Sequence, residues 1–99
     1  MPDDHHLRVI RLRVRKARLK QGLSQEEAAT NATLSLRIYQ RFEAQRVAQA
    51  FNPTFDGLRR VARTVGIPLG ELVAEPTAAE IKELETYPTT KRPKRSKNP

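Results

Sequence analysis

The 99-residue sequence contains no cysteine and no tryptophan, and only 5% of its residues are aromatic. The absence of cysteine excludes a disulfide framework, a thiolate nucleophile and a metal site with sulfur ligands. It fits a reducing compartment, and we therefore expect a cytoplasmic protein. No apolar run approaches the length of a membrane span, and the first six residues, Met-Pro-Asp-Asp-His-His, lack the character of a signal peptide.

The sequence also lacks the residue groups on which catalysis usually depends. Its two histidines are adjacent near the start, its carboxylates are scattered, and it has neither a glycine-rich phosphate loop nor the ligand spacing of a zinc site. Two neighbouring histidines without further ligands are expected to be solvated. We therefore expect no enzyme activity, no metal and no cofactor.

Positive charge is abundant. The chain has 19 lysines and arginines against 11 acidic residues, which gives a formal net charge of +8. Such a balance favours a polyanionic partner, with nucleic acid first and an anionic membrane surface second. The alternative is a basic surface that only keeps the protein in solution. A chain of this length has room for one small domain and a tail.

The most informative stretch is Ser24–Glu43, with the sequence SQEEAATNATLSLRIYQRFE. Ser24 and Glu27 have the spacing of a capping box, which begins a short helix, and Thr30–Thr33 indicates a turn. Ser35 then begins a second helix, which is expected over about 35–43 and would be the helix that enters the major groove. Its periodicity predicts inward side chains at Leu34, Ile38, Tyr39 and Phe42, and outward ones at Arg37, Gln40 and Arg41. Two short helices joined by a tight turn describe a helix-turn-helix.

The rest of the chain predicts an all-α protein. An amphipathic helix is expected over 7–21 and is closed by Gly22. Its predicted apolar face consists of Leu7, Ile10, Val14 and Ala17. Its arginine stripe is expected to be mostly a solvated face, and consists of Arg8, Arg11, Arg15 and Arg18. A helix capped by Thr54 should end at Gly66, and short helices are expected at 69–73 and 77–86. The predicted apolar face of the helix after Thr54 contains Phe55, Leu58, Val61, Ala62 and Val65.

These elements divide the chain into four regions. We expect a flexible N-terminus at 1–6, a helix-turn-helix domain at 7–76, a further helix at 77–86 and a disordered basic tail at 87–99. The tail contains three prolines and five basic residues without an acidic neighbour. It either adds non-specific attraction to phosphates or only aids solubility, and 77–99 can also serve a protein partner.

The runs Gly22–Ala29 and Tyr39–Glu43 resemble the phage Cro/repressor-type helix-turn-helix family. The resemblance implies a five-helix, lambda-repressor-like domain, a transcriptional regulator that binds double-stranded operator DNA, and a homodimer on a palindromic site. It also implies an ion pair between Arg18 and Glu43. The sequence departs from the family at Thr33, where a turn glycine is usual, and in the longer segment 44–52 that precedes Pro53.

The candidate DNA-binding residues lie on the two motif helices. Gln25 begins the first of them, where backbone amides and the helix dipole favour a phosphate. On the second helix, Arg37 can read guanine, Gln40 can read adenine and Leu36 can touch a thymine methyl. Arg37 and Arg41 can alternatively hold phosphates, and Arg46 is either a phosphate contact or a solvated residue. The complete candidate set is Gln25, Ser35, Leu36, Arg37, Gln40, Arg41 and Arg46.

Two alternatives to a specific regulator stay open. One is the antitoxin of a toxin–antitoxin pair, in which the last helix or the tail masks a toxin while the motif represses the operon. The other is a coactivator or antiactivator that has kept the fold but lost DNA reading. Thr33 and the long segment after the motif favour the latter, and packing of Arg37, Gln40 and Arg41 against protein would strengthen it.

Overall fold

Helices account for all the regular structure in the part of the chain that can be described. The computed structural model describes residues 4–44 and 53–86, and these ranges contain no strand. The expected all-α class is therefore correct for them. The elements in chain order are α1 (Asp4–Gln21), α2 (Gln25–Asn31), α3 (Leu36–Arg41), α4 (Phe55–Val65), α5 (Leu69–Val73), α6 (Ala78–Glu83) and the 3-10 helix η1 (Leu84–Thr86).

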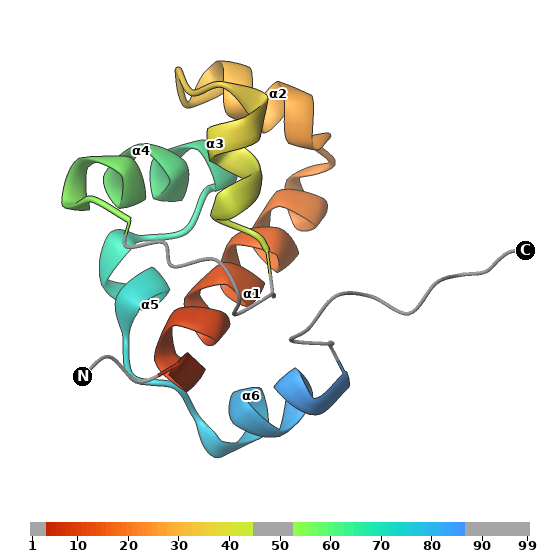
Figure 1. Cartoon of the computed structure of the whole chain (residues 1–99), viewed down its shortest axis with the longest axis vertical. Coiled ribbons are helices and arrows are strands. Elements are labelled where there is room, and N and C mark those ends of the chain that lie inside the picture. The colour runs from red at the N-terminus through yellow and green to blue at the C-terminus, as the bar shows by residue number, and fades with distance from the viewer. Residues whose placement is uncertain (1–3, 45–52, 87–99) are drawn as a thin grey trace, which may run out of the picture.

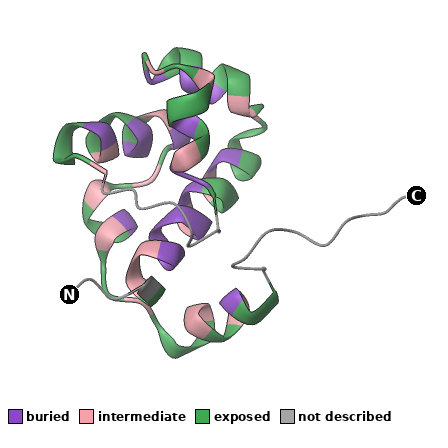
Figure 2. Ribbon diagram, viewed as in Figure 1, coloured by how far each residue is buried: buried purple, intermediate pink, exposed green. Residues whose placement is uncertain are grey.

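The long helix α1 runs through the centre of the molecule (Figure 1). It packs against α4, α5, α6 and η1, while α2 and α3 pack mainly on each other near its C-terminal end. Buried residues follow much of α1, whereas the outer turns of the surrounding helices are exposed (Figure 2). Helix α5 also packs against α4, whereas α6 and η1 contact α1.

The main core joins α1 to α2, α3, α4 and α5. It takes two of the four residues predicted for the apolar face of α1, Ile10 and Val14, as fully buried members. The others, Leu7 and Ala17, pack against it and are partly buried. Its buried residues are Ile10, Val14, Ala28, Ala29, Tyr39, Phe42, Val61, Ala62, Val65 and Leu72.

Helix α4 begins and ends at the predicted caps. The Thr54 hydroxyl accepts a hydrogen bond from Gly57 N, and Gly66 ends the helix with a left-handed backbone, φ 79°. A Cβ atom on Gly57 would lie 2.9 Å from Phe42 Cζ, so glycine lets α4 approach the end of α3 closely. The expectation that Phe55 joins the apolar face is wrong, since this side chain is 69% exposed. Phe55 is the first residue of α4, and the buried residues of this helix begin only at Gly57.

A second apolar cluster lies on another side of α1 and consists of Val9, Leu12 and Leu84. The sequence reading assigned α1 a single apolar strip and therefore missed Val9 and Leu12. The predicted helix at 77–86 is present as α6 followed by η1, and Leu84 is its buried anchor. Because α6 and η1 cover the second strip, α1 is covered on two sides.

The N-terminal part of α1 departs from the expectation in two ways. The helix begins at Asp4 and includes His5 and His6, and His6 Nε2 lies 2.9 Å from the carbonyl oxygen of Val73. The arginine stripe is not mainly solvated, because Arg8 and Arg11 are buried. Arg8 donates to the carbonyl of Leu84 at 3.2 Å. The cover formed by η1 therefore accounts for the burial of Arg8.

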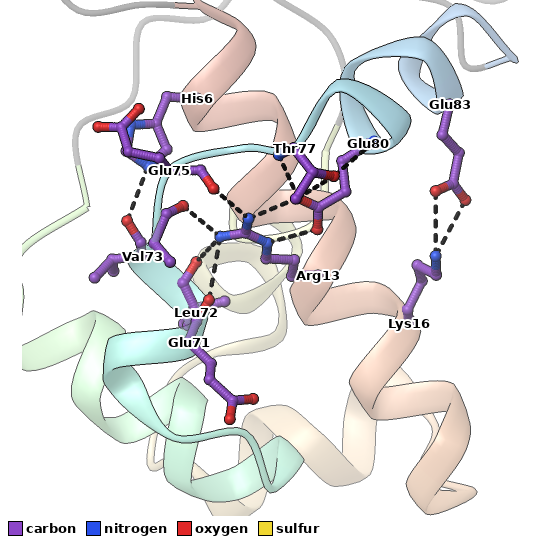
Figure 3. A network of polar contacts seen from close by, with 11 residues as sticks. His6, Arg13, Lys16, Glu71, Leu72, Val73, Glu75, Thr77, Glu80 and Glu83 are labelled. Carbon is purple, nitrogen blue, oxygen red and sulfur yellow. Dashed lines mark hydrogen bonds and ion pairs between the residues drawn. The ribbon is translucent and has the colours of Figure 1, made fainter.

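Arg13 connects α1 to both α5 and α6 (Figure 3). Its Nε and Nη2 atoms donate to the two carboxylate oxygens of Glu80 at 2.8 and 2.7 Å. Its remaining hydrogen bonds go to four backbone carbonyls at and just after the end of α5, at distances of 2.7 to 3.2 Å, those of Glu71, Leu72, Ala74 and Glu75. Carbonyls at a helix C-terminus lack partners within the helix. Arg13 therefore terminates α5 and anchors α6 with one side chain.

Glu80 should make the stability of this anchor dependent on pH. The Arg13 hydrogen bonds lower the pKa of Glu80 from 4.5 to about 2. Because the pKa is lower in the folded chain, Glu80 stabilises the fold above pH 4.5, and this contribution is lost as the pH falls toward 2. We expect Glu80→Gln to lower the free energy of unfolding at pH 7 by about 1 kcal/mol. The difference in free energy of unfolding between Glu80→Gln and the unsubstituted chain should become smaller as the pH falls from 4.5 to 2.

Urea denaturation at several pH values measures this difference. Glu85→Gln is the matched control, since Glu85 is an exposed glutamate two residues beyond the end of α6. A difference for Glu80→Gln that is the same at pH 7 and near pH 3 would show that the Arg13–Glu80 pair does not contribute in the way described.

Candidate functional site: the α2–α3 motif

The two motif helices begin at the predicted caps. Ser24 Oγ accepts from Glu27 N at 3.0 Å, and Glu27 Oε1 accepts from Ser24 N at 2.8 Å, so the capping box of α2 is complete. Ser35 Oγ accepts from Ile38 N at 3.1 Å and caps α3. Ala28 and Ala29 are buried, and their small side chains allow α2 to pack closely in the main core. The sequence therefore determines locally where both helices begin.

The connection between the helices is shorter than expected. Thr30 and Asn31 still belong to α2, and the turn is formed by Ala32 and Thr33. Thr33 has φ 60°, the left-handed conformation that glycine adopts without strain. Its carbonyl lies 3.5 Å from Arg60 Nη1 of α4. Thr33 therefore adopts the left-handed conformation that is usual for a turn glycine, and it does so with strain.

Helix α3 is shorter than the predicted range of 35–43. It spans Leu36–Arg41, and Phe42 is its C-cap. Phe42 and Glu43 are both buried directly after the helix. The backbone tightens at this point, where Phe42 N donates to Tyr39 O and Glu43 N donates to Gln40 O, three residues back instead of four. The segment 45–52 lies outside the described residues, and so does Arg46, the expected phosphate contact.

The carboxylate of Glu43 is the central polar group of the motif. Arg18 donates to it from Nε at 2.6 Å and from Nη2 at 3.1 Å, so the expected ion pair is present and bidentate. The Tyr39 hydroxyl donates to Oε2, and Gln25 Nε2 donates to Oε1 at 3.1 Å. Only 2% of the Glu43 side chain is exposed. The buried Glu43 carboxylate therefore connects three helices. Arg18 of α1, Gln25 of α2 and Tyr39 of α3 all donate to it.

Burial and hydrogen bonding have opposite effects on this carboxyl group. Burial raises the pKa of Glu43. The hydrogen bonds from Arg18, Tyr39 and Gln25 lower it by more than burial raises it, so the pKa lies below its ordinary value. Burial and the hydrogen bond to Glu43 raise the pKa of the Tyr39 phenol. Glu43 is therefore charged and Tyr39 is neutral at physiological pH, which is the combination that the hydrogen bonds require.

A second hydrogen bond extends the network to the surface of α3. Gln40 Nε2 donates to Gln25 Oε1 at 3.1 Å, while the amide nitrogen of Gln25 is held by Glu43. The Gln25 side chain, at the start of the helix where a phosphate is expected, connects the buried carboxylate to an exposed residue. Since Gln40 donates toward α2, its amide is oriented before any ligand arrives. The spacing of Gln25 and Gln40 gave no signal for this pair, because it depends on how the helices cross.

The remaining candidate residues lie mainly on one exposed side of α3. Ser35, Arg37 and Gln40 are exposed, whereas Leu36 and Arg41 are half-buried. Ile38 was expected to face inward, and this is wrong, because 38% of it is exposed. The inward positions of this short helix are filled by Tyr39 and by Phe42 and Glu43 beyond its end, which leave no room for Ile38 in the core.

A hollow adjoins this exposed side. Its lining comes from α1, from α2 with its N-cap, and from α3, and consists of Arg15, Arg18, Ser24, Gln25, Glu26, Leu36 and Gln40. The hollow thus brings the capped start of α2 together with Gln40 and with an exposed arginine of α1. This is the arrangement that a phosphate group near a helix N-terminus would use.

Two other kinds of feature, a metal-binding group and a membrane-spanning helix, are absent from residues 4–44 and 53–86. These ranges hold no group of three or more histidine or acidic side chains that could bind a metal ion. Among the same residues, no helix is long and apolar enough to cross a membrane. Comparisons with protein-family models, curated proteins and solved structures found no match to this chain. The interpretation of the site therefore depends on its own geometry.

The strained turn predicts a stabilising substitution. Thr33→Gly should raise the free energy of unfolding by about 1 kcal/mol, because glycine adopts the left-handed backbone without the clash of a branched Cβ. The matched control is Thr30→Gly in the last turn of α2, which should lower stability by about 1 kcal/mol. Thermal or urea unfolding distinguishes the two. Equal losses for both substitutions would contradict the conformation described at Thr33.

The buried ion pair predicts a much larger effect. Arg18→Ala leaves the Glu43 carboxylate buried without its cation and should cost roughly 3–5 kcal/mol of stability. Arg15→Ala on the same helix is the control, and it should change stability by less than about 0.5 kcal/mol because Arg15 is exposed. Urea denaturation at pH 7 measures both. Similar small effects for the two variants would show that Arg18 is not needed to compensate Glu43.

Proposed function

We propose that this chain is a sequence-specific, double-stranded-DNA-binding transcriptional regulator with a lambda-repressor-like helix-turn-helix domain. The observation that carries the proposal is the Glu43–Gln25–Gln40 chain of hydrogen bonds, which ties the exposed side of α3 to the buried core. A helix that reads base edges has to hold its polar groups in position, because discrimination depends on directed hydrogen bonds. Gln40, which can read adenine, has its amide oriented in this way.

The exposed chemistry of α3 supports this function over a protein-interaction module. Packing of Arg37, Gln40 and Arg41 against protein would have favoured the latter. Arg37 and Gln40 are exposed on the same short helix, while Arg41 is half-buried. Arg37 makes no ion pair with the described residues and is available for the two acceptors of a guanine. The net charge of +8 adds sequence-independent attraction to the phosphate backbone.

The α2 end of the motif supplies the positioning contact in this proposal. The first amides of α2 and Arg15 border the same hollow, and a phosphate placed there would set the register of α3 on the duplex. The protein would act in the cytoplasm as a homodimer on a palindromic operator, with half-sites about 10 base pairs apart. Each α3 would then enter one major groove.

Substitution of Arg37 tests the proposal. Arg37→Ala should weaken binding to a duplex selected from a random library by roughly 1–3 kcal/mol and relax the preference at one base pair. Lys82→Ala on α6 removes the same charge far from α3 and should leave the preference unchanged (Figure 1). Fluorescence anisotropy at several salt concentrations measures both variants. Failure of the chain to enrich any sequence, with equal binding to all duplexes, would contradict the proposal.

A further inference from the structure

A second hollow lies between α4 and the turn that joins α2 to α3. Its volume is about 320 Å³, at the lower end of the range for small-ligand sites, and it shares no residue with the hollow at the start of α2. Its lining includes two residues of the turn and four charged residues of α4, namely Ala32, Thr33, Asp56, Arg59, Arg60 and Arg63. The other lining residues are uncharged, so three arginines and one carboxylate leave two net positive charges. We call this site the α4 hollow.

The four charged residues share one side of α4. At 100° of rotation per residue, they fall within about 100° around the helix axis, and Arg63 lies between Arg59 and Arg60 in this projection. All four are exposed, whereas the buried residues of α4 lie on the opposite side. Like charges three or four residues apart on a helix repel each other. Asp56 is the one acidic residue of α4, so it relieves this repulsion only in part, and a further anion would relieve the rest.

Asp56 orients two of the arginines and leaves part of their hydrogen-bonding capacity unused. Its Oδ1 accepts from Arg59 Nη2 at 3.1 Å, and its Oδ2 lies 3.0 Å from Arg60 Nε. Arg60 Nη1 lies 3.5 Å from the carbonyl oxygen of Thr33. Because a guanidinium group has five N–H donors, Arg59 keeps donors on Nε and Nη1, and Arg60 keeps those on Nη2. Both side chains are thus held in place with donors left for a ligand.

Arg63 is the uncompensated member of the cluster. Among the described residues, its side chain has neither a hydrogen-bonding partner nor an ion-pair partner. The planar fork of a guanidinium group matches two oxygens of a phosphate. A terminal phosphate group carries a charge between about −1.5 and −2 at pH 7, which is close to the opposite of the net charge of the hollow. Such a group would neutralise the cluster and present two oxygens to Arg63.

We propose that the α4 hollow binds the terminal phosphate group of a small phosphorylated molecule, with Arg63 as the main contact. Arg59 and Arg60 would donate to the remaining phosphate oxygens through the groups that Asp56 leaves unused. The volume of the hollow leaves room for the phosphate and for a small group attached to it. This site goes beyond the proposed DNA binding and does not depend on it.

The backbone of a DNA duplex suits the α4 hollow less well than a small phosphate ester. Each phosphate of the duplex is a diester with one negative charge, so it would leave one positive charge of the hollow uncompensated. The phosphate of the DNA proposal lies at the start of α2, whereas the α4 hollow is lined by the turn that follows the end of α2. A helix of seven residues separates the two positions by about 10 Å. The α4 hollow is therefore a separate site with a different preference.

Titration of the ¹⁵N-labelled full chain with two phosphate compounds tests the proposal, at pH 7 and constant ionic strength. Glycerol 3-phosphate has a terminal phosphate and should cause saturable shifts of the amide signals of Ala32, Thr33, Arg63 and Thr64. Dimethyl phosphate is a diester with one charge. It should bind about tenfold more weakly, because it makes fewer charge-assisted hydrogen bonds.

Two variants assign the binding to the arginine cluster. Arg63→Gln keeps hydrogen-bond donors but removes the charge, and it should weaken the binding of glycerol 3-phosphate about tenfold. Since the Arg63 side chain has no partner among the described residues, this variant should keep the fold, which thermal unfolding checks. Lys20→Gln removes the same charge from an exposed residue at the end of α1, outside the hollow, and should change the affinity by less than about twofold.

The inference is wrong if glycerol 3-phosphate causes no saturable shift at the α4 hollow, if both compounds bind equally well, or if Arg63→Gln binds as tightly as the unsubstituted chain. Weaker binding of a duplex to Arg63→Gln, without binding of glycerol 3-phosphate to the unsubstituted chain, would assign the hollow to the DNA backbone and would also overturn it. A chain that enriches no duplex but binds glycerol 3-phosphate through Arg63 supports the inference and contradicts only the proposed function.

Discussion

The buried carboxylate of Glu43 is the constraint on which the motif depends. A charge that is almost completely removed from water has to be compensated in full, because an unpaired buried ion is strongly destabilising. Here the compensation comes from Arg18 of α1, Gln25 of α2 and Tyr39 of α3, so three helices must meet at one point. Gln25 also accepts a hydrogen bond from Gln40 at the surface, which links the Gln40 side chain to the buried carboxylate. The position of the exposed helix is thus coupled to the stability of the core.

A second arginine–glutamate pair, in the middle of α1, holds a different part of the fold. Arg13 pairs with Glu80 and binds the carbonyls that follow α5, so it fixes the C-terminal helices to α1 (Figure 3). Its partners differ entirely from those of Glu43. The α5–α6 region can therefore be weakened at Glu80 without a direct effect on the contacts that hold α3.

Local signals in the sequence were enough to predict much of this structure. The caps at Ser24, Ser35 and Thr54 depend on side-chain-to-backbone hydrogen bonds over three residues, and all three are present. Helical periodicity also identified the main core. The pairing of Arg18 with Glu43 came from a resemblance to a family and is confirmed by the geometry. Arg13 and the exposure of Ile38 were missed, because each depends on which helix covers a given side, and periodicity alone does not reveal this.

The central claim is that the exposed side of α3, supported by α2, binds DNA. Titration of the ¹⁵N-labelled chain with a library-selected duplex, followed by amide chemical shifts, tests it most directly. The largest shifts should lie in α3 and at the start of α2, with smaller ones in α6. The account would be contradicted if the largest chemical-shift changes lay in α5 and α6. It would also be contradicted if no amide shifted at concentrations that saturate binding to a non-specific duplex.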